Sequence, residues 1–281
     1  MEHQLEIPFT SKPINCIRYS KGGTKAEQSD RTADNPSLIF THGAGGTLNS
    51  DGIANFAKGF AKSSSVLCFQ GNMNLKSRVK MFSAVMENQE SAACLGGRSM
   101  GARAAVMAAT TDTKMLILAS YPLHTAKETR DQILLDIDPA IDVLFIEGDM
   151  DDMCDLERLE EVRKKMKCKT WLVVVKGADH GMNIKPKSAS AEVVSMTGEL
   201  AAQWVQERDE TRRKGTVNWD EGVKWSGWAQ DVPKETEKVK TSAKAPREQS
   251  KTAKRKKPAP SDRDEPRDSV ISSRTRKRRK V

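Results

Sequence analysis

Short apolar runs, each bounded by turn-forming residues, recur along the first two thirds of the chain. They are continuous rather than alternating, which is typical of strands buried on both faces, as in a parallel sheet. We therefore predict strands within residues 14–20, 37–43, 65–71, 91–97, 114–122, 141–149 and 170–177.

Helical periodicity separates these runs. Ile53, Phe56, Ala57 and Phe60 recur at the spacing of one helix face, and the same spacing returns further along the chain. Regular alternation of strands and helices predicts an α/β fold with a doubly wound, mostly parallel sheet. Further helices are expected near residues 75–85, 101–111, 155–167 and 189–207, and a surface loop at 20–36.

Charge divides the chain into two parts. Residues 1–208 hold 25 Lys and Arg against 26 Asp and Glu, a net −1, whereas residues 209–281 hold 22 against 12, a net +10. The second part is rich in Lys, Arg, Glu, Pro and Ser, a composition typical of disorder. We expect a globular domain at 1–208, a tryptophan-containing linker at 209–232 that docks onto it, and a disordered basic tail at 233–281.

Cysteine spacing and hydropathy argue against several classes of protein. The five cysteines are scattered and form no C-x-x-C pair, so neither structural zinc nor a disulfide framework is expected. The N-terminus lacks the apolar core of a signal peptide, and no apolar run approaches the ~20 residues of a membrane span. We expect an intracellular protein with no cofactor, no metal and no membrane partner.

The loop at 41–47, THGAGGT, follows a predicted strand. Ligands bind open α/β sheets at the carboxyl ends of strands, and glycines there let backbone N–H groups approach a ligand. Gly43 and Ala44 are therefore candidates for an oxyanion hole. A phosphate loop fits less well, because Leu48 replaces the third glycine of G-x-G-x-x-G. A tight turn into a helix is the other interpretation.

Residues 97–101, GRSMG, match G-x-S-x-G between a predicted strand and a predicted helix. In a nucleophile elbow this pattern holds a serine on a strained turn, and small flanking residues let strand and helix approach. Ser99 is the candidate nucleophile, with the N–H of Met100 as an oxyanion donor. Alternatively, Ser99 is only a residue in a tight turn.

Two later loops supply the partners that a serine nucleophile needs. Asp151 follows Ser99 by 52 residues and His180 follows Asp151 by 29, the chain order Ser, Asp, His of α/β-hydrolases. Asp149, Asp152 and Asp155 stay open as the acid. Asp179 could instead cap a turn. The substrate-cleft candidates are His42, which is also expected to shape the glycine-rich turn, Tyr121 and His124.

With these motifs, residues 35–208 resemble the α/β-hydrolase fold. More narrowly, they resemble the hydrolase-like family shared by a testis-expressed protein and the third subunit of the non-specific-lethal (NSL) histone acetyltransferase complex. The resemblance implies hydrolase-like proteins with unassigned substrates, some of which act in chromatin complexes. It rests on LIFTHGAGG (38–46), LGGRSMGARAA (95–105), ASYPLH (119–124), FIEGDMDDM (145–153) and GADHGM (177–182).

The segment between Tyr121 and Ile141 is short and leaves room only for a short lid. We therefore expect an open cleft suited to small or exposed esters. The leading hypothesis is a nuclear serine hydrolase of ester or acyl type, with Ser99, His180 and Asp151 as its triad. The rival is a non-catalytic hydrolase-like subunit of a chromatin-associated complex.

Two basic clusters lie in the tail, KRKK at 254–257 and RTRKRRK at 274–280. Such runs are typical of nuclear localisation signals or of nucleic-acid contact. No recognised nucleic-acid-binding motif accompanies them, so we favour nuclear import through an import receptor and expect nucleic-acid contact only through the tail. Without import the protein would be cytoplasmic.

Overall fold

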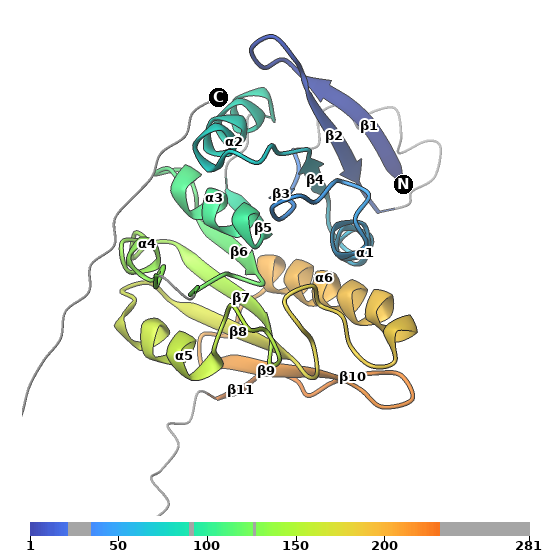
Figure 1. Cartoon of the computed structure of the whole chain (residues 1–281), viewed down its shortest axis with the longest axis vertical. Helices are drawn as coiled ribbons and strands as arrows, with labels where there is room; N and C mark the ends of the chain where they lie inside the picture. Colours follow the sequence, from blue (N-terminus) through green and yellow to red (C-terminus); the bar gives the residue numbers. More distant parts are fainter. Residues whose placement is uncertain (22–34, 90–92, 126–127, 231–281) are drawn as a thin grey trace, which may run out of the picture. The chain divides into compact units, whose positions relative to one another are not determined.

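The computed structural model describes residues 1–21, 35–89, 93–125 and 128–230. A single mixed sheet runs through them (Figure 1). Every predicted run contains a strand, so the patterning argument is confirmed. These strands are β2 (Ile14–Tyr19), β3 (Leu38–Thr41), β4 (Val66–Phe69), β5 (Cys94–Arg98), β6 (Met115–Ala119), β7 (Asp142–Gly148) and β8 (Thr170–Val175).

Four further strands extend the sheet at its two edges. They are β1 (Glu2–Ile7), β9 (Arg212–Trp219), β10 (Val223–Trp225) and β11 (Ala229–Gln230). The strand order is β1-β2-β4-β3-β5-β6-β7-β8-β9-β10, with β11 also pairing β9. The neighbouring strands β4, β3, β5, β6, β7, β8 and β9 pair in parallel. Strands β1, β2, β10 and β11 join the sheet antiparallel.

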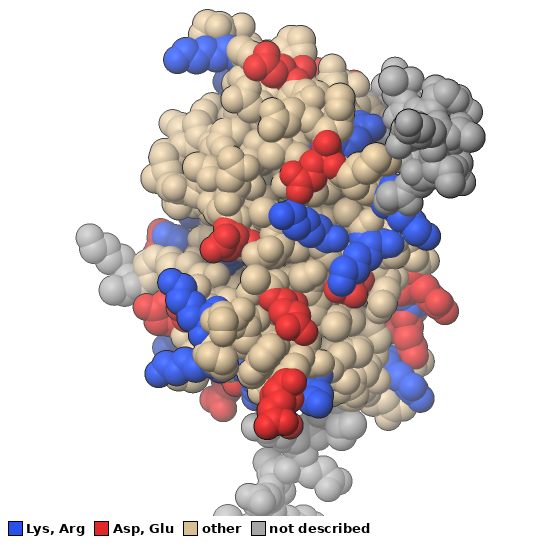
Figure 2. Space-filling model, turned by 90° about the vertical axis from the view of Figure 1, so that its right-hand side faces the viewer, with Lys and Arg blue, Asp and Glu red and all other residues tan. Residues whose placement is uncertain are grey.

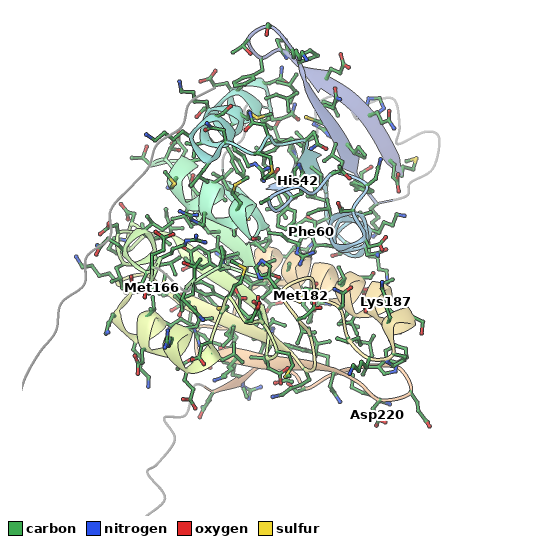
Figure 3. The ribbon with its side chains drawn as sticks, in the orientation of Figure 1. His42, Phe60, Met166, Met182, Lys187 and Asp220 are labelled. Atoms are coloured by element: carbon green, nitrogen blue, oxygen red, sulfur yellow. The ribbon has the colours of Figure 1, made fainter. Side chains whose placement is uncertain are left out.

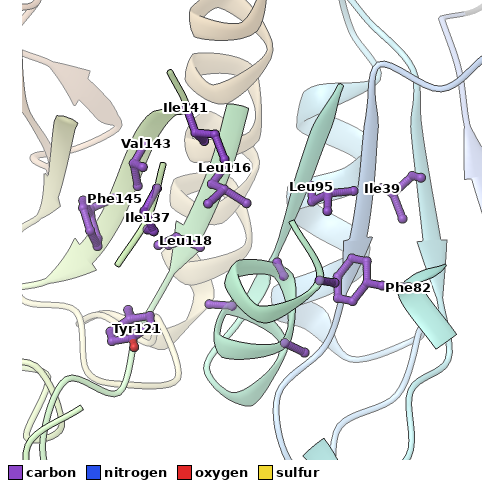
Figure 4. Packing of buried hydrophobic residues seen from close by; sticks show 14 of the residues in the cluster. Ile39, Phe82, Leu95, Leu116, Leu118, Tyr121, Ile137, Ile141, Val143 and Phe145 are labelled. Carbon is purple, nitrogen blue, oxygen red and sulfur yellow. The ribbon is translucent and has the colours of Figure 1, made fainter. Parts of the chain in front are cut away.

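Helices cover both faces of the sheet, as predicted (Figure 1). One face packs against α1 (Asp51–Phe60) and α6 (Ser190–Gln206), which follows the short helix η2 (Lys187–Ala189). The other packs against α2 (Leu75–Gln89), α3 (Met100–Ala108), α4 (Gln132–Leu135) and α5 (Leu156–Lys165). Figure 4 shows this second core, in which Phe82 of α2 lies beside Leu95 and Ile39 of the sheet. The doubly wound α/β architecture is thus observed.

The sheet continues past residue 208, where we expected the domain to end. Strand β9 pairs in parallel with β8, and the ring of Trp225 lies over Gly215 so closely that a Cβ there would be 2.1 Å from it. Trp225 and Trp228 stack edge to face at 5.2 Å. Residues 212–230 are therefore part of the folded unit, whereas the tail from 233 lies outside the described residues.

The segment that joins β6 to β7 spans residues 120–141. Its described residues include one helix, the single turn α4, in agreement with a short lid. Basic and acidic side chains are interspersed on the face shown in Figure 2, as the near-neutral balance of residues 1–208 predicts. Among the described helices, none is long and apolar enough to cross a bilayer.

Candidate active site

Three strand ends bring the predicted triad together. Ser99 follows β5, Asp151 follows β7 and His180 follows β8, and all three strands are parallel, so their carboxyl ends share one edge of the sheet. His180 Nε2 lies 3.0 Å from Ser99 Oγ, and His180 Nδ1 lies 2.8 Å from Asp151 Oδ2. The predicted convergence of three distant residues is therefore present in the fold.

The acceptor atoms of these two hydrogen bonds show which nitrogen of His180 carries the proton. A carboxylate can only accept, so His180 Nδ1 carries the proton and donates it to Asp151 Oδ2. Nε2 is then left with a free lone pair facing the hydroxyl of Ser99. The imidazole is thus in the tautomer that can take a proton from the serine.

Ser99 stands in a strained backbone conformation between β5 and α3. Its φ is 50° and its ψ is −115°, a region that costs a non-glycine residue roughly 1–3 kcal/mol. The flanking glycines allow the close approach that this turn needs. A Cβ on Gly97 would lie 2.5 Å from the backbone of Gly101, and one on Gly101 would lie 2.6 Å from the carbonyl oxygen of His42.

The carboxylates left open by the sequence have separate partners. Asp149 Oδ1 accepts from Gly177 N at 2.6 Å, and Asp155 caps α5 by accepting from Arg158 N at 2.9 Å. Asp152 is exposed. Only Asp151 among these candidates contacts His180, so the geometry selects it. Asp179 accepts from the backbone and side chain of Asn183 and thus caps a turn, the alternative considered for it.

The glycine-rich loop lies against the serine. A Cβ built on Gly43 would be 3.2 Å from Ser99 Cβ, so the start of this loop packs beside the nucleophile candidate. Met100 is the first residue of α3, where backbone N–H groups have no partner within the helix. Two segments that carry predicted oxyanion donors therefore adjoin Ser99, the glycine-rich loop at Gly43 and the start of α3 at Met100.

His42 holds this loop from inside the protein and is only 2 % exposed (Figure 3). Its Nε2 accepts from Gly71 N at 3.0 Å, so its Nδ1 carries the proton and donates to Gly43 O at 2.7 Å. Gln70 Nε2 adds a second contact to Nε2 at 2.7 Å. Burial lowers the pKa of His42 below the ordinary histidine value. His42 is accordingly a neutral structural residue, and the expectation that it shapes the turn is met.

Arg78 is a second brace of the same loop, and sequence reasoning missed it. The side chain is fully buried and donates to the carbonyl oxygens of His42 and Gly43, and to Asn72 O from Nε at 3.0 Å. Burial lowers the pKa of Arg78 to about 10. The signal was present, because Arg78 occupies position i+3 of the apolar stripe that begins at Leu75.

The predicted cleft residues are only partly where we expected them. Tyr121 is fully buried and donates its hydroxyl to Arg130 O at 2.8 Å, so it fixes the segment after β6 and does not line an open cleft. The burial of His42 likewise removes it from an open cleft. His124 is partly exposed. Its backbone N–H donates to the carbonyl oxygen of Met153 at 3.1 Å, and Met153 is two residues beyond Asp151.

Two further charged residues lie beside the triad, and the sequence analysis gave neither a role. Arg98 directly precedes Ser99, and its Nη2 donates to His180 O at 2.8 Å. Glu147, at the end of β7, is fully buried and accepts from Tyr121 N at 2.8 Å. Burial raises the pKa of Glu147 well above its usual range. Within the described residues, no group of three or more His, Cys, Asp or Glu side chains could hold a metal ion.

Comparisons with known proteins agree with this architecture. Residues 72–206 match the family model described as an alpha/beta hydrolase domain. Est1E from Butyrivibrio proteoclasticus is 14 % identical with a TM-score of 0.56, over 72 % of this chain and 98 % of that one. An alpha-beta serine hydrolase homologue from Coxiella burnetii is 16 % identical with a TM-score of 0.55, over 71 % and 96 %.

A third structure, XC6422 from Xanthomonas campestris, is titled a serine hydrolase without lid. It is 14 % identical with a TM-score of 0.52, over 74 % of this chain and 97 % of that one. At such identities the likeness concerns the fold alone. The protein thus has the α/β-hydrolase fold, and its residues 72–206 are similar to the alpha/beta hydrolase domain of the family model.

Proposed function

We propose that the protein is a serine hydrolase acting on carboxylic esters or acyl groups. The observation that carries the proposal is the hydrogen-bonded chain from Ser99 Oγ through His180 to Asp151, at 3.0 and 2.8 Å. A serine hydroxyl is a poor nucleophile until a neighbouring imidazole takes its proton, and the carboxylate on Nδ1 keeps that imidazole in the required tautomer.

The reaction runs in two halves. Ser99 Oγ attacks the acyl carbon while its proton passes to His180 Nε2, and Asp151 stabilises the resulting imidazolium. Collapse of the tetrahedral intermediate breaks the bond to the leaving group, which takes the proton from Nε2. A water molecule then attacks the acyl-enzyme, again giving its proton to His180, and the free acid departs as Ser99 recovers its own.

The negative charge on the carbonyl oxygen needs donors in both halves. The N–H of Met100 and the N–H of Gly43 or Ala44 flank Ser99 and form the proposed oxyanion hole. The strained φ of 50° at Ser99 and the slim glycines around it support its assignment as a nucleophile elbow. The preorganised turn would present Oγ to substrate without further rearrangement.

The proposed substrates are small or exposed esters. One-turn α4 leaves the described part of the segment after β6 without a substantial lid. The Xanthomonas protein is titled lidless, and Est1E has been solved with ferulic acid bound. Both are compatible with an open site, although the assignment to this chain rests on the triad geometry.

Labelling with a fluorophosphonate probe tests the proposal. Wild-type protein should acquire one phosphonyl group on Ser99, located by peptide mass spectrometry, and Ser99→Ala should acquire none. Ser83→Ala is the matched control, since Ser83 lies on α2, where its hydroxyl donates to Val79 O of the same helix at 3.4 Å. A folded wild-type protein that neither reacts with the probe nor cleaves p-nitrophenyl acetate would contradict the proposal.

We also propose that the protein has a chromatin-associated partner and is located in the nucleus. Likeness to the third NSL subunit supports a chromatin-associated partner, and the clusters at 254–257 and 274–280 support nuclear import. A fluorescent fusion of the full chain should enter the nucleus, and replacing the basic residues of both clusters with alanine should leave it in the cytoplasm. If the protein neither reacts with the fluorophosphonate probe nor cleaves esters, but co-purifies stoichiometrically with chromatin proteins, the result would instead favour the non-catalytic subunit.

A further inference from the structure

Arg98 is a partly buried cation beside the candidate site. It ends β5, directly before Ser99, and its Nη2 donates to His180 O at 2.8 Å and to Ser120 Oγ at 3.2 Å. These partners follow β8 and β6, so one guanidinium links the ends of three strands. Its contact with His180 joins residues 82 positions apart in the chain.

The hydrogen bond from Arg98 fixes the backbone of His180, whereas the bonds with Ser99 and Asp151 fix its imidazole. The loop carrying His180 is held at one end by Asp149, which accepts from Gly177 N, and at the other by Asp179, which accepts from Asn183 N. The carbonyl oxygen of His180 itself accepts a hydrogen bond from Arg98. Because Arg98 is covalently next to Ser99, this bond ties the backbone of the imidazole to the backbone of the serine.

Burying a guanidinium is unfavourable unless its surroundings compensate the charge. The carboxylates of Asp151 and Asp179 lie near enough to Arg98 to offset part of that cost. Ser120 holds a φ of 46°, an uncommon backbone conformation, while its hydroxyl accepts from Nη2. The molecule thus maintains a charged residue and a distorted backbone at a place where an apolar side chain would fill space more simply.

We propose that Arg98 is a positioning residue that sets the distance between His180 Nε2 and Ser99 Oγ through its bond to the His180 carbonyl. The inference rests on the proposed hydrolase function. Proton transfer requires the two groups to be held within about 0.5 Å of the productive geometry. Arginine suits this role better than lysine, since the planar guanidinium fixes the directions of the two N–H groups with which Nη2 donates to both acceptors.

Gly52→Ala on α1 tests the proposal without removing the charge. A Cβ at Gly52 would lie 1.8 Å from Arg98 Nη1, so the guanidinium must move, while alanine is otherwise favoured over glycine in a helix. The rate constant for fluorophosphonate labelling should fall roughly 10- to 100-fold, because a displacement of about 1 Å is enough for such a loss. Lys58→Ala, at an exposed position of the same helix, should keep the wild-type rate.

Direct replacement of Arg98 is the second test of the proposal. Arg98→Met should lose more activity than Arg98→Lys, and with p-nitrophenyl acetate the loss should appear in kcat with KM nearly unchanged. The far-downfield proton resonance of His180 Nδ1, hydrogen-bonded to Asp151, should broaden or shift in Arg98→Met and Gly52→Ala but not in Lys58→Ala. A purely space-filling role would not move this resonance in protein that remains folded by circular dichroism.

The outcomes separate this inference from the function on which it rests. If wild-type protein fails to react with probe and ester, the hydrolase proposal fails, and the resonance still reports whether Arg98 positions His180. If wild type reacts and Gly52→Ala matches it in labelling rate and in resonance, Arg98 is not a positioning residue. Should Arg98→Met fail to fold, Gly52→Ala and Arg98→Lys decide the question.

Discussion

The two halves of the candidate site are built in different ways. In the triad, side chains make the functional contacts, and the imidazole of His180 is 26 % exposed. In the glycine-rich loop, the proposed functional groups are backbone N–H groups, and the side chains that hold the loop, Arg78 and His42, lie inside the protein. One half presents its chemistry directly, whereas the other depends on buried polar contacts.

This difference predicts how damage is divided between activity and stability. Replacing a triad residue by one of the same shape removes chemistry and leaves the packing intact. Replacing a buried brace leaves backbone carbonyls without donors, at a cost of roughly 1–3 kcal/mol for each unpaired group. Variants of the triad should therefore lose activity with little loss of stability. Variants of the buried side chains that hold the loop should lose both activity and stability.

The largest expected effect is on activity, at Asp151. Its two oxygens accept from different donors, Oδ2 from His180 Nδ1 and Oδ1 from Met153 N at 2.8 Å. In Asp151→Asn the fixed N–H of Met153 takes the one remaining oxygen, so an N–H₂ group faces His180 and favours the wrong tautomer. The labelling rate should fall about 10³- to 10⁴-fold, as such a replacement does in a serine protease.

Stability is the control for that experiment. The melting temperature of Asp151→Asn should stay close to that of wild type, because the two side chains have the same shape. Asp152→Asn, on an exposed neighbour, should change neither quantity. An Asp151→Asn protein that reacts at the wild-type rate would show that another group orients His180.

A smaller loss of activity but a larger loss of stability is expected at Arg78. Arg78→Met removes the donors to the carbonyls of His42, Gly43 and Asn72. The loop should then lose its placement beside Ser99, with a drop of roughly 10²-fold in labelling rate, the scale of losing one oxyanion donor. Chemical denaturation should show a free energy of unfolding lower by several kcal/mol, about 1–3 kcal/mol for each carbonyl.

Two companion variants sharpen this result. Arg78→Lys keeps the charge and part of the donation, so it should fall between wild type and Arg78→Met in both quantities. Lys80→Met removes a cation from an exposed position of the same helix and should leave both unchanged. Arg78→Met with wild-type stability would mean that the buried carbonyls are satisfied in another way, and the contrast between the two halves would fail.

How much the sequence predicts follows the same division. The buried strands and the amphipathic helices were predictable, because continuous apolar runs and helical stripes are local signals. Strand β1 was missed because EHQLEI has only Ile7 buried, and β9 because RRKGTVNW has no continuous apolar run. Both strands are fixed by pairing with their neighbours, which a local pattern does not record.

Within the site, chain order and strand ends were enough to predict Ser99 and His180 as neighbours. They favoured Asp151 as the acid but left Asp149, Asp152 and Asp155 open, because the direction of each carboxylate depends on the turn after Gly148. Arg78 and Arg98 were missed for a related reason. Arginine is ordinarily expected at the surface, and its burial here depends on backbone carbonyls that only the folded chain brings together.

The smallest expected effect concerns acidity and His42. In the folded protein Nε2 accepts from Gly71 N, and burial holds the pKa of His42 below the value of about 6.5 that applies to the unfolded chain. As pH falls below 6.5, the unfolded chain takes up a proton there that the folded protein does not. The contribution of His42 to stability is therefore complete above pH 6.5 and declines with acidification, by at most about 1.4 kcal/mol per pH unit.

His42→Gln isolates this contribution, because glutamine can accept from Gly71 N through Oε1 but does not titrate. Thermal unfolding of both proteins between pH 8 and pH 5 should give a constant difference above neutrality and a shrinking one below about pH 6.5. Since the variant keeps the acceptor and loses only the donation to Gly43 O, its labelling rate at pH 8 should fall less than that of Arg78→Met. Stability curves that run parallel down to pH 5 would mean that His42 is protonated as readily inside the fold as outside it, and burial in the glycine-rich loop would then not hold it in its neutral form as the pH falls below 6.5.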